Sequence, residues 1–368
     1  MNILKKLLLL NLCLSFIALA DNAPLDPPYK NHVHPEVITI LNTNISPEIS
    51  RFNTLKLVEK QSSVKSQGKR GTCSIFSAVA MVEHLLIKDS QNFDFSEQWL
   101  EYLTAGQRGS EGSSSISNAY AIRNHSLVLE KDWRYNPQGW AKYDEDRYES
   151  YNRDVEETCE YVLGSSDLKR CLIGQRDPRL LYADRNSLLD YNSEFYDPDF
   201  YRILQEREYF RASTQISPYY IDTSSQIQGY LDEGYALLLD VDFFYGAWNH
   251  RKADEYGLRR NMKKWDKGEV SYPLRNSKDY AESYKSDNRA GHSILIVGYD
   301  SQKVLEKTVR LQNGEDVIVK STGVYFFKNS WGTDGFGRKF KLDGQELPGY
   351  GMIAMDYAHQ YGSFILYQ

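Results

Sequence analysis

The sequence lacks an apolar run long enough to cross a lipid bilayer. The apolar stretch near the N-terminus, residues 7–17, falls short of the roughly 20 apolar residues that a spanning helix needs. An excess of basic residues is missing too, since the formal net charge is −6 and both signs are mixed along the chain. No basic stripe is available for nucleic acid and no basic face for anionic lipid. We therefore expect neither a nucleic-acid partner nor a membrane anchor.

The first twenty residues have the order of a secretory signal. Two lysines precede the apolar stretch, and an Ala-Leu-Ala sequence ending at residue 20 follows it. This order is typical of a signal peptide with a cleavage site. The sequence predicts a signal peptide over residues 1–20 and export to the periplasm or the extracellular space.

Cysteine is scarce, with four residues in the chain. Cys13 lies inside the predicted signal, so Cys73, Cys159 and Cys171 remain after cleavage. Three thiols are an odd number for a compartment that permits disulfides. We expect Cys159 and Cys171 to pair across a short polar loop and Cys73 to stay free. The alternative is that all three are reduced or buried.

Helical patterns dominate the first half of the chain. Residues 21–60 are polar, begin with several prolines and have no long helical period, so they read as a leader. Residues 72–86 are small and apolar without Gly or Pro, which predicts a buried helix. A second helix is expected from Ser96, a suitable N-cap, with Trp99 facing inward, and a third over residues 116–124.

Strand patterns dominate the second half. Apolar, β-branched and aromatic residues predict strands at 235–241, 293–299 and 324–328. Helices followed by strands indicate an α+β fold with two subdomains.

Chemistry is indicated first by Cys73, at the start of the 72–86 helix. A thiolate there faces unpaired N–H groups and the positive end of the helix dipole, so we expect a lowered thiol pKa. Gly68 and Gly71 allow a tight loop that returns the Gln67 amide toward the sulfur, where it can donate to a developing oxyanion.

Two further signals lie at strand ends. His292 precedes the 293–299 strand and has the small residues Ala290 and Gly291 before it, which leave room for a substrate side chain. Asn329 follows the 324–328 strand and can hydrogen-bond an imidazole, and Trp331 can shield that bond from water.

Taken together, these segments resemble the papain family of cysteine peptidases. The matching residues are 64–68, 71–79, 96–98, His292 with 297–299, and 328–333. Their order and residue types follow the family pattern of a cysteine followed by a distant histidine and asparagine.

The resemblance implies roles for individual residues. Cys73 would be the nucleophile, His292 the general acid-base, Asn329 the orienting residue and Gln67 an oxyanion donor beside the Cys73 backbone N–H. Substrate would contact Gly112, Ser113, Ala290, Gly291 and Trp331. A helical left subdomain and a β-barrel-like right subdomain would enclose the cleft over residues 61–368. We expect a monomer that acts on polypeptides without metal or organic cofactor.

The sequence departs from the family pattern at two positions beside Cys73. Ser74 replaces a tryptophan, and Arg70 replaces a cysteine that usually forms a disulfide. Extra segments are expected at about 137–212, 249–289 and 301–322. They are either surface insertions or, in at least one case, a wall of the cleft.

Two other functions fit the same residues. A papain-fold acyltransferase would pass the acyl group to an amine instead of water. A binding or adhesion protein derived from a peptidase would keep the fold with weak catalysis. Cys73, His292, Asn329 and Gln67 together favour the peptidase.

Overall fold

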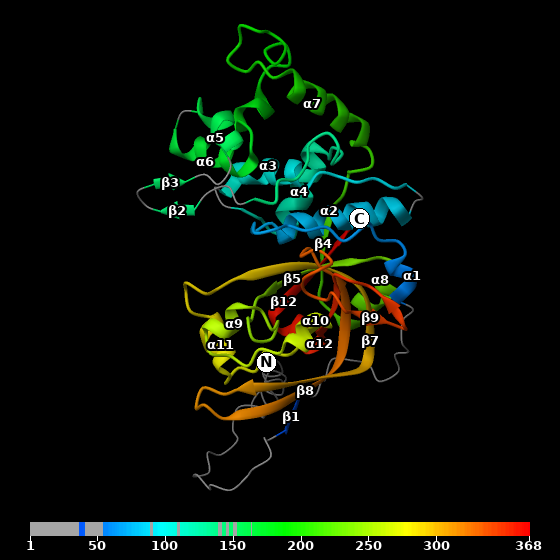
Figure 1. The fold of residues 1–368 in the computed structure, drawn as a ribbon. Coiled ribbons are helices and arrows are strands. Elements are labelled where there is room, and N and C mark those ends of the chain that lie inside the picture. Colours follow the sequence, from blue (N-terminus) through cyan, green and yellow to red (C-terminus); the bar gives the residue numbers. More distant parts are fainter. Residues whose placement is uncertain are drawn as a thin grey trace, which may run out of the picture. The chain divides into compact units, whose positions relative to one another are not determined.

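The computed structural model describes residues 37–40, 54–88, 91–108, 111–138, 142–144, 147–149, 153–162 and 164–368. The predicted signal peptide and most of the predicted leader lie outside these residues. Within the described part, no helix is long and apolar enough to span a membrane. Helices dominate the described chain up to residue 210, and most strands follow with further short helices among them, which agrees with the expected α+β class (Figure 1).

Three helices of the first half form where the sequence predicts them. They are α2 (Cys73–Lys88), α3 (Glu97–Arg108) and α4 (Ser115–His125). A short α1 (Thr54–Val58) precedes them. α2 is buried on nearly all sides because small and apolar side chains cover its whole circumference.

Serine caps fix where two of these helices begin. The Ser96 hydroxyl accepts the backbone N–H of Trp99 at 3.0 Å, and Trp99 is fully buried, as expected. The Ser114 hydroxyl accepts the N–H of Ser117 at 3.2 Å. Each cap satisfies an N–H that the first helical turn leaves without a partner.

An eight-stranded sheet forms the core of the second half, within the described residues. Seven strands follow the order β4-β12-β5-β7-β8-β11-β6, and β1 pairs with β8 beside this path. Their bounds are β1 (Val37–Ile40), β4 (Pro218–Ile221), β5 (Leu237–Asp242), β6 (Glu269–Val270), β7 (Gly291–Arg310), β8 (Asp316–Lys328), β11 (Tyr350–Ala354) and β12 (Gly362–Tyr367). The pairs β1 with β8 and β6 with β11 are parallel, and the other pairs on this path are antiparallel.

Helix α2 joins the helical part to this sheet. The hydroxyls of Ser77 on α2 and Ser293 on β7 lie 2.6 Å apart and are both buried. Two further helices, α8 (Ser224–Asp232) and α12 (Met355–Tyr361), pack against sheet strands. The start of α2 is therefore held directly against the start of β7.

Residues 301–322, expected as an inserted segment, extend two sheet strands. β7 and β8 continue through this segment as a long hairpin, and β1 adds beside it. In the outer part of the hairpin, buried residues alternate with exposed residues on β7 and with half-buried residues on β8, which is the pattern of a sheet with one covered face. The strand predicted to end at residue 299 therefore runs to Arg310.

The segment 137–212 is largely helical. It contains β2 (Lys142–Asp144), β3 (Arg147–Glu149), α5 (Arg153–Cys159), α6 (Ser165–Gly174), η1 (Pro178–Tyr182) and α7 (Pro198–Phe210). A disulfide joins Cys159 and Cys171, whose Cα atoms are 5.8 Å apart, and Cys73 is a free thiol. α6 packs against α3.

The remaining elements are short. The segment 249–289 holds α9 (Lys252–Glu255), α10 (Met262–Asp266), strand β6 and α11 (Lys278–Ser283). A separate two-stranded ribbon pairs β9 (Lys341–Leu342) with β10 (Gln345–Glu346).

Candidate active site

Cys73 and His292 line the same open cavity, whose volume is about 610 Å³. Cys73 is the first residue of α2 and is partly exposed, while His292 lies near the start of β7 opposite Val241 of β5. The Ser77–Ser293 contact holds these two element ends together. Two residues that are far apart in the sequence thus face one space, as the resemblance implies.

The imidazole of His292 is held by one hydrogen bond and several aromatic rings. Its Nε2 lies 2.9 Å from Oδ1 of Asn329, a geometry in which the ring nitrogen donates. Trp331 stacks on the ring with centroids 4.6 Å apart, and Trp248 packs edge-on at 5.1 Å. Because Nε2 is used by Asn329, Nδ1 is the ring nitrogen left for chemistry.

Burial sets the protonation preferences of both groups. It raises the pKa of the Cys73 thiol to about 11, although backbone N–H groups of Ser293 and Ser74 act in the opposite direction. It also lowers the pKa of His292 to about 4, opposed by the Asn329 hydrogen bond. The expected lowering of the thiol pKa by the helix start is therefore wrong for the free site, because desolvation outweighs the helix N–H groups. Either charge alone is disfavoured here.

Gln67 is buried beside the site and its amide bridges two loops. Nε2 donates to the carbonyl of Arg70 at 2.6 Å, and Oε1 accepts from the Ser330 hydroxyl at 2.7 Å. The backbone N–H of Gln67 also donates to the carbonyl of Ser330 at 2.8 Å. The amide is thus fixed next to the Asn329 loop, and an oxyanion role would use its second N–H.

The expected substrate contacts divide into two groups. Gly112, Ser113 and Gly291 line the cavity, whereas Ala290 and Trp331 do not. Trp331 instead covers the His292 ring, as its second expected role requires.

Ser74, which stands where the family pattern has a tryptophan, joins α2 to the cavity wall. Its hydroxyl accepts the backbone N–H of Ser113 at 3.0 Å. Its carbonyl accepts from Nδ2 of Asn118 at 2.8 Å. A hydrogen-bonded contact between α2 and the 111–114 loop thus occupies the position of an aromatic packing contact.

Sequence reasoning missed several residues around the cavity. Asp240 and Asp242 lie on β5, and residues 360–363 at the C-terminal end complete the wall. Asp240 accepts the N–H and hydroxyl of Ser115 at 3.1 and 2.7 Å. The sheet register that sets Val241 opposite His292 places both aspartates there, and no local motif signals it. Within the described residues, no group of three or more His, Cys, Asp or Glu side chains could hold a metal ion.

Comparison with solved structures finds several cysteine proteases at low identity. Xylellain, a cysteine protease from Xylella fastidiosa, is 12% identical, with 92% of this chain and 99% of that chain covered and a TM-score of 0.46. Digestive procathepsin L2 from the larval midgut of Tenebrio molitor is 16% identical, with 93% and 76% covered and a TM-score of 0.41. Comparison with curated protein sequences gives no match.

The family comparison is more direct. Residues 52–175 match the papain family of cysteine proteases. This range contains Gln67, Cys73 and the 111–114 wall of the cavity, while His292 and Asn329 lie beyond it. The matched segment makes up about a third of the chain, and over this segment the sequence is similar to the papain family of cysteine proteases.

Proposed function

We propose that the chain is a cysteine-type endopeptidase that hydrolyses polypeptides, with Cys73 as nucleophile, His292 as general acid-base and Asn329 as orienting residue. The observation that carries this proposal is the hydrogen bond between Nε2 of His292 and Oδ1 of Asn329 at 2.9 Å. It leaves Nδ1 of His292 for a proton from the Cys73 thiol, and both residues line one cavity.

Catalysis begins with transfer of the Cys73 proton to His292. The thiolate attacks the scissile carbonyl carbon, and collapse of the tetrahedral intermediate breaks the C–N bond while His292 returns the proton to the leaving amine. The product is a thioester on Cys73. His292 then removes a proton from water, whose attack releases the carboxylic acid and restores the thiol.

Formation of the charged pair is coupled to burial. A lone thiolate or a lone imidazolium is disfavoured in this site, as the raised thiol pKa and the lowered imidazole pKa indicate. Proton transfer between the two groups creates both charges together, so their attraction offsets part of the desolvation cost. The Asn329 oxygen further stabilises the protonated ring through the Nε2 hydrogen bond.

The oxyanion would be stabilised by two N–H donors. One is the backbone N–H of Cys73 at the start of α2, and the other is the second amide N–H of Gln67. The bonds from Gln67 to Arg70 and Ser330 restrict its amide to a single orientation.

Export of the enzyme is supported by a separate observation. The Cys159–Cys171 disulfide belongs to the kind of bond that persists in oxidising compartments. Together with the predicted signal peptide, it favours the periplasm or the extracellular space. N-terminal sequencing of the mature protein should begin at Asp21, and a retained N-terminus would reject cleavage.

Hydrolysis of a peptide amide tests the enzymatic proposal. The wild-type protein should release the amine product from a fluorogenic peptide, and Cys73→Ser should abolish release. Undiminished hydrolysis by Cys73→Ser would refute the assignment. Addition of an amine acceptor separates hydrolysis from acyl transfer, since a transferase would form the new amide instead of the acid.

A further inference from the structure

Arg70 lies three residues before the nucleophile and is almost completely buried. Its side chain has 0% exposure, although arginine is among the residues that are seldom fully buried without partners. A guanidinium in this position would be strongly destabilising unless its donors were paired. The contacts of Arg70 therefore determine how the loop before α2 is held in place.

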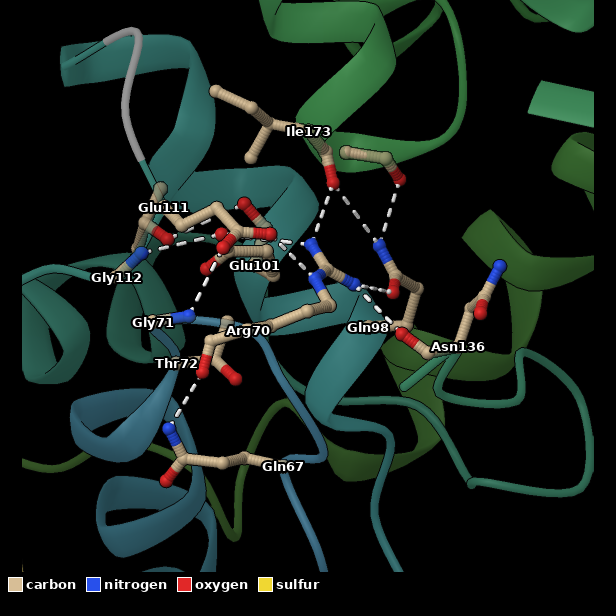
Figure 2. A network of polar contacts seen from close by, with 12 residues as sticks. Gln67, Arg70, Gly71, Thr72, Gln98, Glu101, Glu111, Gly112, Asn136 and Ile173 are labelled. Atoms are coloured by element: carbon tan, nitrogen blue, oxygen red, sulfur yellow. Dashed lines mark hydrogen bonds and ion pairs between the residues drawn. The ribbon is translucent and has the colours of Figure 1, made fainter. Parts of the chain in front are cut away.

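The donors of Arg70 reach several separate segments of the chain (Figure 2). They contact Glu111 Oε1 at 2.6 Å, Gln98 Oε1 at 2.7 Å, the Asn136 carbonyl at 3.1 Å, the Ile173 carbonyl at 2.9 Å and Glu101 Oε1 at 3.8 Å. Arg70 thus ties the loop before α2 to α3, to α6 and to the 111–112 loop.

Glu111 and Glu101, which pair with Arg70, also accept hydrogen bonds from backbone N–H groups of residues that line the cavity. Glu111 Oε2 accepts the N–H of Gly71 at 2.9 Å, and Glu101 Oε1 accepts the N–H of Gly112 at 3.2 Å. Gly71, Glu111 and Gly112 all line the cavity. Each carboxylate therefore connects the guanidinium to a backbone N–H beside the nucleophile.

The two loops joined in this way lie in very close contact. Gly112 has φ +71°, and a Cβ atom there would lie 2.3 Å from the carbonyl oxygen of Gly71. Their backbones therefore meet without space for a side chain. A small displacement of either loop would change the position of Gly112 and Ser113 relative to Cys73.

We propose that Arg70 and Glu111, assisted by Glu101, are positioning residues that hold the 112–113 backbone in place to pair with a bound peptide. This inference rests on the proposed function. It assigns to a buried ionic network the task of fixing the loop before the nucleophile, at the position where the family pattern has a disulfide cysteine. The planar fork of Arg70 suits this task because it reaches several acceptors at fixed angles, which a lysine cannot reproduce.

Two variants and a matched control test the network. Glu111→Gln removes the charge but keeps a side chain of the same shape, and Arg70→Lys keeps the charge but removes the fork. Glu208→Gln is the control, because Glu208 on α7 pairs with Arg211 and does not line the cavity. For each protein, kcat and KM on a peptide amide, inactivation by a peptidyl epoxide, and alkylation of Cys73 by iodoacetamide are measured, with folding checked by thermal unfolding.

If the network positions the 112–113 backbone, the assays that need peptide pairing should respond to these substitutions and the assay that does not need it should not. Peptide kcat/KM and epoxide inactivation should fall about 10-fold to 10²-fold in Glu111→Gln and Arg70→Lys, the scale of a misplaced substrate. Iodoacetamide alkylation, which needs no peptide pairing, should stay within about 2-fold of wild type. Glu208→Gln should match wild type in every assay.

Three results would overturn the inference. One is a folded Glu111→Gln protein with unchanged peptide kcat/KM. Another is iodoacetamide alkylation that falls in parallel with hydrolysis, which would mean that the network acts on the thiol itself. The third is a Glu111→Gln protein that does not fold, since the carboxylate would then serve overall stability. Absence of both hydrolysis and epoxide labelling in the wild type would instead refute the proposed function.

Discussion

Aromatic rings pack against the imidazole of His292 on the side away from the cavity, and Asn329 is the hydrogen-bond partner of its Nε2. Trp331 and Trp248 cover its faces and edge, and Asn329 accepts its Nε2–H. Trp331 is in turn stacked on Trp265 at 5.7 Å. The orientation of the ring therefore depends on Asn329 for direction and on the tryptophans for exclusion of water.

Loss of the orienting hydrogen bond should affect turnover more than binding. Asn329→Ala is expected to lower kcat on a peptide amide about 10²-fold with little change in KM, because the ring loses its directed partner. Steady-state kinetics measure both values. Asn313→Ala, at the β7–β8 hairpin tip where the Asn313 side chain bonds to Glu315, is the control. An equal loss in both variants would contradict the role of Asn329.

The depressed pKa of His292 has a consequence for stability. Burial lowers this pKa from the ordinary histidine value of 6.5 to about 4 in the folded protein, so the unfolded chain takes up a proton first as pH falls. The contribution of neutral His292 to the free energy of unfolding is therefore fully present above about pH 6.5. It decreases as pH falls toward 4, by up to about 3 kcal/mol.

Urea unfolding between pH 7 and pH 4 measures this effect. The comparison uses Cys73→Ser, which has no thiolate to pair with the ring, against Cys73→Ser/His292→Gln. Other histidines with lowered pKa values, such as the half-buried His250 and His359, are common to both proteins. The account predicts a steeper loss of stability on acidification in Cys73→Ser, and identical pH dependence would show that His292 is not desolvated.

The residues that the sequence could identify are those with a local signal. Cys73 begins an apolar helix, and His292 and Asn329 lie at strand ends, so short motifs mark all three. Sheet register and packing bring Trp248 and Asp240 to the site. No motif in the neighbouring sequence marks these two residues as part of it. The partners of Arg70 come from segments up to 103 positions away, which no motif connects.

At the scale of elements, the contact between α2 and β7 decides whether the site exists. The buried pair Ser77–Ser293 joins them one helical turn after Cys73 and one residue after His292. A relative shift of the two elements would move Cys73 away from His292. This contact depends on the packing of two predicted elements, and their periodicity alone does not give the relative placement.

The Cys159–Cys171 disulfide stabilises a local unit. Both cysteines belong to a small buried cluster with Val155, Val162 and Leu172, separate from the main core. Cys171→Ser is expected to cost about 3 kcal/mol at most, the scale of a bond that closes a short loop. Peptide mapping of non-reduced protein from its natural compartment should recover the linked pair, and recovery of both as free thiols would reject it.

The sequence pattern does not predict the full length of the β7–β8 hairpin. In its outer part, buried residues alternate with exposed residues on β7 and with half-buried residues on β8. Lys307 occupies one of the buried positions, and its ammonium donates to Oδ1 of Asn249 at 2.8 Å. The polar residues 300–303, where the pairing with β8 shifts register, interrupt the apolar pattern, so the sequence predicts an end of the strand that is too early.

For the whole molecule, the 137–212 segment acts on the site indirectly. None of its described residues lines the cavity, and its aromatic residues at positions 140, 143, 148 and 151 lie outside the described side chains. Its Ile173 carbonyl accepts from Arg70, and its Pro137 carbonyl accepts the backbone N–H of Lys69 at 3.4 Å. The segment therefore holds the loop before Cys73 in place through hydrogen bonds.

Removal of the 137–212 segment should therefore lower thermal stability more than it changes the ranking of substrates. Replacement of residues 139–212 by a Gly-Ser bridge is expected to lower the thermal unfolding midpoint, because Arg70 loses an acceptor and α3 loses its contact with α6. The measurement is thermal unfolding together with relative cleavage rates for short and long peptides. A stable variant with a changed substrate ranking would instead support a cleft wall.

The central claim is that Cys73 is a nucleophile activated by His292, and covalent trapping tests it most directly. Mature protein is incubated with a peptidyl epoxide and mapped by peptide mass spectrometry, beside a His292→Ala variant whose fold is checked by circular dichroism. The account predicts one adduct, on Cys73, and its loss or strong slowing in the variant. A folded wild-type protein without an adduct, or labelling of Cys73 that is equally fast without His292, would contradict it.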